Sequence, residues 1–187
     1  MPDRVSSRIV RISQRLAALS LLLMVGMLLL NGAGWLAPGT HSLDGLRFGL
    51  SGRMMSGLPL DLAALPVWTR LGAVLLSSIP LVALAIGLLQ LRALFRCYAR
   101  SEYFSVAAAD HMGRAGRAVL AWAMLDFLCE PLLSVWLTIG QPPGHRLVTL
   151  SVGAGSVVAL FMAACITVIA HILRRASELD QEHRQFV

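Results

Sequence analysis

Two carboxylates, Asp126 and Glu130, lie in the middle of the otherwise apolar segment AWAMLDFLCEPLLSVWL, which runs from Ala121 to Leu137. Their spacing of four residues places them on one face of a helix. In an apolar medium such a pair can hold a proton, bind a cation or form hydrogen bonds to neighbouring helices. The choice among these chemistries depends on the elements that surround the pair.

The composition predicts an integral membrane protein. Of 187 residues, 57% are hydrophobic and 14% are charged, and the mean hydropathy is +0.71. Soluble domains of this size carry more charge. The three cysteines, Cys97, Cys129 and Cys165, have neither C-x-x-C nor zinc-ligand spacing. We therefore expect no disulfide, metal site or cofactor.

Four apolar runs are long enough to cross a bilayer. A helix rises about 1.5 Å per residue, so about 20 residues cross the hydrocarbon core. The sequence therefore predicts an all-α integral membrane protein, a bundle of four transmembrane helices that forms a single membrane domain over residues 1–187. The predicted spans are residues 16–36, 71–91, 118–139 and 147–172.

The arginines predict how these spans are oriented. All 16 basic residues are arginine, and twelve of them flank the spans on one side. Because basic residues concentrate on the cytoplasmic side, we expect both termini in the cytoplasm. The chain then has an outer loop at 37–70, a cytoplasmic hairpin at 92–117 and a cytoplasmic tail at 173–187. The net charge of +6 belongs to these flanks, so we expect no direct binding of nucleic acid.

The first span also has features of a secretory signal peptide. Arginines precede it, and the sequence NGAGWLA offers small residues for cleavage. However, the apolar region of a signal peptide is about 7–15 residues long, and here the apolar character continues from Leu16 to Leu36. We expect the span to be retained, with cleavage as the alternative.

The cytoplasmic hairpin has helical patterns on both sides of a break. Apolar residues recur with helical spacing from Leu91 to Tyr98, so the second helix should continue beyond the bilayer. Ser105 suits the N-cap of the next helix. The apolar stripe either packs within the hairpin or docks another protein. The residues of this docking surface would be Arg92, Phe95, Arg96, Tyr98, Arg100, Glu102 and Phe104.

Two extracytoplasmic segments allow a small β pairing. Residues 43–50 show partial alternation of apolar side chains, and the strand-like residues 147–149 follow a turn. In the fourth span, Gly155, Ala159 and Ala163 form a row of small residues, which predicts the close approach of another helix. That helix belongs either to the same chain or to a second copy of it. Homodimerisation is therefore an open alternative.

The two carboxylates make the third span marginal. An ionised acid at the bilayer centre costs about 2.5 to 3.5 kcal/mol on insertion scales, so neighbouring helices must cover this face. Hydroxyls at a compatible depth, on Ser77, Ser78 and Ser156, are candidate partners. Three interpretations stay open: protonated acids that cross-link helices, a watery pocket for a proton, cation or cationic molecule, or contacts with another membrane protein.

The hairpin motif LFRCYARSEYFS fits the pattern L-F-x-x-Y-x-x-G-E-x-F-S. The matching residues are Leu94, Phe95, Tyr98, Glu102, Phe104 and Ser105, whereas Ser101 replaces the glycine. Together with EPLL from Glu130 and the ending ASELDQEHRQFV, the motif resembles the uncharacterised bacterial family called domain of unknown function twenty-nine seventy-five (DUF2975). The resemblance covers most of residues 71–187.

This resemblance implies a four-helix membrane protein without an established activity, paired in some members with a small helix-turn-helix regulator. It supplies no catalytic residues, and no G-x-S-x-G or H-E-x-x-H motif occurs, so we expect no enzyme. We predict a multi-pass protein of the bacterial inner membrane that acts with such a regulator or another cytoplasmic protein. The alternative is a small proton- or cation-coupled transporter or binder that uses Asp126 and Glu130.

Overall fold

The computed structural model describes residues 2–36, 65–100, 105–139, 148 and 154–185. The helices in these ranges are α1 (Pro2–Leu36), α3 (Val67–Ala99), α4 (Val106–Thr138) and α5 (Ala154–Gln185). All four are long and apolar enough to cross a membrane, which confirms the predicted all-α, multi-pass architecture. The described ranges contain no strand. Nearly all residues of the predicted β pairing lie outside them.

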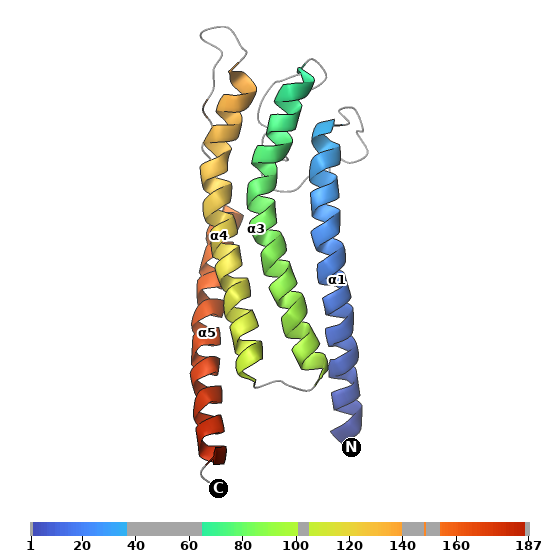
Figure 1. The fold of residues 1–187 in the computed structure, drawn as a ribbon, viewed down its shortest axis with the longest axis vertical. Coiled ribbons are helices and arrows are strands. Elements are labelled where there is room, and N and C mark those ends of the chain that lie inside the picture. Colours follow the sequence, from blue (N-terminus) through green and yellow to red (C-terminus); the bar gives the residue numbers. More distant parts are fainter. Residues whose placement is uncertain (1, 37–64, 101–104, 140–147, 149–153, 186–187) are drawn as a thin grey trace.

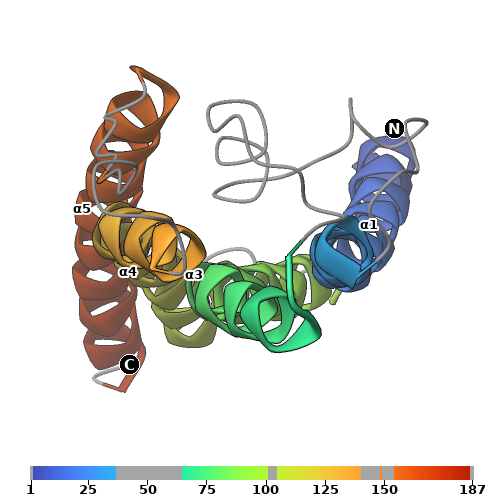
Figure 2. The same ribbon diagram turned by 90° about the horizontal axis from the view of Figure 1, so that it is seen from above.

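The helices pack side by side in chain order. α1 contacts α3, α3 contacts α4, and α4 contacts α5. Seen from above in Figure 2, this row is curved, with α1 and α5 at its two ends. The bundle is therefore open, and α4, the helix that carries the two acids, has a neighbour on each side.

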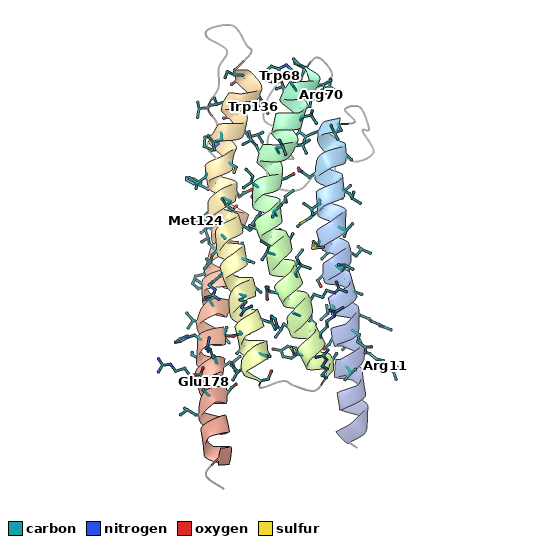
Figure 3. The ribbon with its side chains drawn as sticks, in the orientation of Figure 1. Arg11, Trp68, Arg70, Met124, Trp136 and Glu178 are labelled. Carbon is teal, nitrogen blue, oxygen red and sulfur yellow. The ribbon has the colours of Figure 1, made fainter. Side chains whose placement is uncertain are left out.

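Figure 1 shows that α1 begins and α5 ends at the same end of the molecule, where α3 also ends and α4 begins. We call this the arginine end and the opposite one the tryptophan end. Trp68 and Trp136 meet at the tryptophan end (Figure 3), with ring centroids 5.8 Å apart at 85°. Trp136 Nε1 also donates a hydrogen bond to the Thr69 carbonyl, at 3.1 Å. Tryptophans gather in this way at membrane–water interfaces.

The hairpin between α3 and α4 is held by local contacts at the arginine end. The Ser105 hydroxyl accepts a hydrogen bond from the Ala108 N–H at 3.1 Å, which confirms the predicted N-cap. His111 Nδ1 lies 2.8 Å from Gln90 Oε1 and joins the two helices. Leu94 is buried, so this part of the apolar stripe packs within the chain.

Helix α5 is shifted along α4 toward the arginine end. Arg174 pairs with Asp110, and Gly113 faces Ala170. Counting back along this antiparallel pair places Ala154, the first residue of α5, level with roughly residue 129 of α4. Figure 1 shows α5 beginning near the middle of α4. α5 therefore covers the half of α4 nearer the arginine end.

Candidate functional site

Asp126 and Glu130 are buried within the row of helices. The two residues are only 4% and 2% exposed. Neither is without a partner in the structure. Burying a polar group is costly unless its hydrogen bonds are supplied by other groups of the protein. The burial of the two acids therefore agrees with the expectation that other parts of the chain shield this face of the third span.

An asparagine, Asn31 of α1, binds the two serines that the sequence suggested as partners of the acids. Asn31 Nδ2 donates to Ser78 Oγ at 3.0 Å, and Ser77 Oγ donates to Asn31 Oδ1 at 3.1 Å. In the structure these hydroxyls therefore bind the amide in place of the two carboxylates. Asn31 and Ser77 are buried, so this pair of bonds ties α1 to α3 inside the span.

We expect Asn31→Ala and Ser77→Ala to be energetically coupled because each substitution removes the partner of the other. Hydrogen bonds between transmembrane helices contribute about 0.6 kcal/mol on average and at most about 1.7 kcal/mol. A double-mutant cycle, followed by unfolding in mixed micelles, should give a coupling within that range. Strict additivity of the two substitutions would contradict the hydrogen bond.

The amide cluster and the carboxylates lie in one layer, near the middle of the helices. On α3 and α4, Gln90 faces His111 and Thr69 faces Trp136, so Ser77 is level with roughly Asp126. We call the group formed by Asn31, Ser77, Ser78, Asp126 and Glu130 the polar layer. By the register of α4 and α5, Ser156 reaches roughly the same level, but among the described residues no hydrogen bond joins it to either acid.

Apolar clusters lie on both sides of the polar layer. Toward the tryptophan end, Trp35, Ala73 and Leu133 pack together with Cys129. Toward the arginine end, Met27, Leu81 and Ala85 form a second cluster. Between α1 and α3 the polar layer therefore has apolar side chains on both sides along the helix axes, and the low local dielectric strengthens the hydrogen bonds there.

Two clefts open at the arginine end, away from the polar layer. The first, of about 100 Å³, lies between α4 and α5, where Arg174 pairs with Asp110 at 3.0 Å and with Glu178 at 2.9 Å. The second, of about 210 Å³, lies between α1 and α3. Neither of these clefts is lined by Asp126 or Glu130.

The residues of the predicted docking surface differ in their accessibility. Arg96 and Arg100 are exposed, whereas Arg92, Phe95 and Tyr98 are half-buried. Glu102 and Phe104 lie outside the described residues. The sequence did not indicate that α1 would pack beside these side chains and form the second cleft with them.

Comparison with known proteins assigns the family. A family model described as a protein of unknown function (DUF2975) matches residues 54–185, which is more than half of the chain. The chain belongs to the DUF2975 family. The suspected resemblance is therefore confirmed. Neither the curated proteins nor the solved structures gave a significant match.

The structure shows what several residues of the DUF2975-like motifs do in this chain. Leu94 is buried near the end of α3, and Ser105 caps α4. In the EPLL segment, Glu130 belongs to the polar layer and Leu133 is fully buried next to it. These residues therefore build the fold of the DUF2975 protein around α4. They form no constellation of nucleophile, base and orienting group that would indicate a reaction.

Proposed function

We propose that this DUF2975 protein is a regulatory or interaction protein of the bacterial inner membrane that presents its arginine end to a partner in the cytoplasm. The orientation is supported by the arginines that flank the helices at this end. The small helix-turn-helix regulators implied by the family resemblance are the first candidates for the partner.

The observation that carries this proposal is that α3 and α4, joined by a hydrogen bond near the arginine end, both expose arginines there. Arg96 and Arg100 are exposed on α3, and Arg114 and Arg117 are exposed on α4. The bond between His111 and Gln90 joins the two helices, and the Ser105 cap fixes where α4 begins. Exposed charges of one sign attract a partner of opposite charge and raise its association rate.

The replacement of Arg96 and Arg100 by glutamate is expected to release the partner. Reversing two charges of the binding surface should lower association roughly tenfold or more, and wild-type binding should weaken as salt is added. The measurement is co-purification of the soluble partner with the full chain after gentle extraction. Arg175→Glu is a matched control because Arg175 is exposed at the same end on α5. Recovery of the bare wild-type chain, or equal retention by all variants, would contradict the proposal.

A second candidate function is proton or cation binding coupled to transport. It is favoured by one observation: two buried carboxylates share one face of α4 near the middle of the membrane-spanning helices. Ionisable groups at this depth mark ion pathways in many membrane proteins. We rank this function second because neither cleft at the arginine end reaches the pair.

A further inference from the structure

The cleft between α1 and α3 at the arginine end has the donors of an anion site. α1 contributes Gln14, Ala17 and Ala18, and α3 contributes Arg92, Phe95 and Arg96. The alanines leave space between the helices, and the two arginines are one turn apart on the same wall. The cleft therefore combines two guanidinium groups, an amide and one aromatic ring.

This cleft differs in charge from the one between α4 and α5. The residues that line the cleft between α1 and α3 include no carboxylate. In the other cleft, Asp110 lies in the lining and pairs with Arg174, which also binds Glu178. In the cleft between α1 and α3, by contrast, no carboxylate in the lining offsets the charge of Arg92 and Arg96.

Arg92 supplies a second, independent indication of a ligand. Its Nε is inaccessible to solvent, and nothing among the described residues accepts a hydrogen bond from it. Buried donors in folded proteins are nearly always hydrogen-bonded. An acceptor bound in the cleft would satisfy this nitrogen, because an arginine fork matches the oxygens of a phosphate group.

The position of the cleft identifies the kind of phosphate. Gln14 precedes the apolar run of the first span, and Arg92 follows that of the second, so the cleft lies where lipid headgroups meet the protein. Within two turns toward the middle of the helices, both walls carry exposed apolar side chains, among them Leu19 on α1 and Leu89 on α3. These surfaces suit acyl chains.

We propose that this cleft binds the headgroup phosphate of an anionic phospholipid in the leaflet at the arginine end. Arg92 and Arg96 donate hydrogen bonds to the phosphate oxygens, and the Gln14 amide binds the polar remainder of the headgroup. Basic pockets between transmembrane helices recognise anionic headgroups by this chemistry. The inference does not depend on the proposed protein partner.

The test measures how the full-length protein in detergent retains phosphatidylglycerol and phosphatidylcholine, by native mass spectrometry. The wild type should prefer phosphatidylglycerol. The replacement of both Arg92 and Arg96 by glutamine should lower its affinity for this lipid roughly 25-fold, at about fivefold for each arginine. The matched control replaces Arg100 and Arg114, which have the same charge and lie outside the cleft, and should change the affinity less than about threefold.

Several outcomes would overturn the proposal. Equal loss in both double variants would show general attraction to the basic end, and equal retention would show that the cleft is unused. Displacement of the lipid by inorganic phosphate would assign the site to a free anion. Loss of a soluble acidic partner, with phosphatidylglycerol retained, would assign it to a protein. If the cleft variant misfolds by circular dichroism, Ala18→Leu fills the cleft with both arginines intact, and its retention of the lipid would also refute the proposal.

Discussion

Glu130→Leu is expected to make the third span insert more readily into a membrane and, at the same time, to make the folded protein less stable. For insertion, the change removes an acid from the bilayer centre and adds an apolar side chain, a gain of about 3 kcal/mol. For folding, Glu130 is only 2% exposed and has a partner. Its loss leaves a buried polar group unsatisfied, at a cost of about 1–3 kcal/mol.

Two measurements check that Glu130→Leu favours insertion and lowers the stability of the folded protein. Translocon-mediated insertion of residues 118–139 in a reporter protein gives the insertion free energy. Unfolding of the full chain in mixed micelles gives the stability. Glu130→Gln is the matched control, because it keeps the length and hydrogen-bonding capacity of the side chain and should change the stability by less than about 1 kcal/mol. A leucine variant that both inserts better and folds more stably would contradict a structural role for Glu130.

The same glutamine variant separates the two candidate functions. Under the interaction proposal, Glu130→Gln folds and retains its partner, since the exposed arginines of the hairpin are unchanged. Under the transport alternative, it abolishes pH-dependent uptake in proteoliposomes while expression stays normal. The carboxylate, and not the shape of the side chain, is what the second function requires.

The helices were predictable because the properties that determine them depend on short stretches of sequence. Hydropathy and length are properties of one segment, and so is the cap that Ser105 forms with Ala108 three residues later. The open row was not predictable from these properties. Hydropathy indicates that a helix enters the membrane, but not which of its faces meets which neighbour. Most of the surface of α5 is apolar, so hydropathy does not distinguish the face that packs on α4 from the other faces.

In the polar layer, too, the sequence does not determine which side chains of different helices meet. The position of Ser77 and Ser78 in the sequence indicates their depth along α3, but their partner depends on how α3 is rotated against both neighbours. Asn31 is the only asparagine of the chain, and its position inside an apolar run was the available signal. In the sequence NGAGWLA it was instead weighed as part of a cleavage site. A lone amide in a span requires a partner on another helix.

For the close packing of α4 and α5, the sequence pattern indicated the small residues of α5 but not those of α4. Ala163, in the predicted row of small residues, is 1% exposed and contacts another helix of the same chain. The complementary residues are two glycines of α4, Gly113 and Gly116, which no pattern had indicated. A Cβ atom would be crowded at Gly116 but not at Gly113, so alanine substitutions at these two positions test how α4 packs on α5.

Gly116→Ala is expected to lower the free energy of unfolding by about 2 kcal/mol, whereas Gly113→Ala should leave it unchanged or raise it. Overpacking of a filled interface costs about 1–3 kcal/mol, and alanine in place of glycine gains about 0.5–1 kcal/mol in a helix. At position 116 a Cβ would lie 2.5 Å from Thr167 Oγ1 and 3.2 Å from the Ala163 carbonyl oxygen. At position 113 the nearest atom would be the Ala170 Cβ, at an ordinary 3.6 Å.

Thr167 cannot move away without loss, because its hydroxyl donates a hydrogen bond to the Ala163 carbonyl at 2.8 Å. Thr167→Ala removes the obstructing oxygen and should therefore rescue part of the stability lost in Gly116→Ala, with a coupling of about 1 kcal/mol. Rescue should be incomplete because the Ala163 carbonyl belongs to the backbone and stays in place. Thermal unfolding of the two single variants and the double variant in the same micelles measures this coupling. Equal effects of alanine at positions 113 and 116 would contradict the packing of α4 on α5.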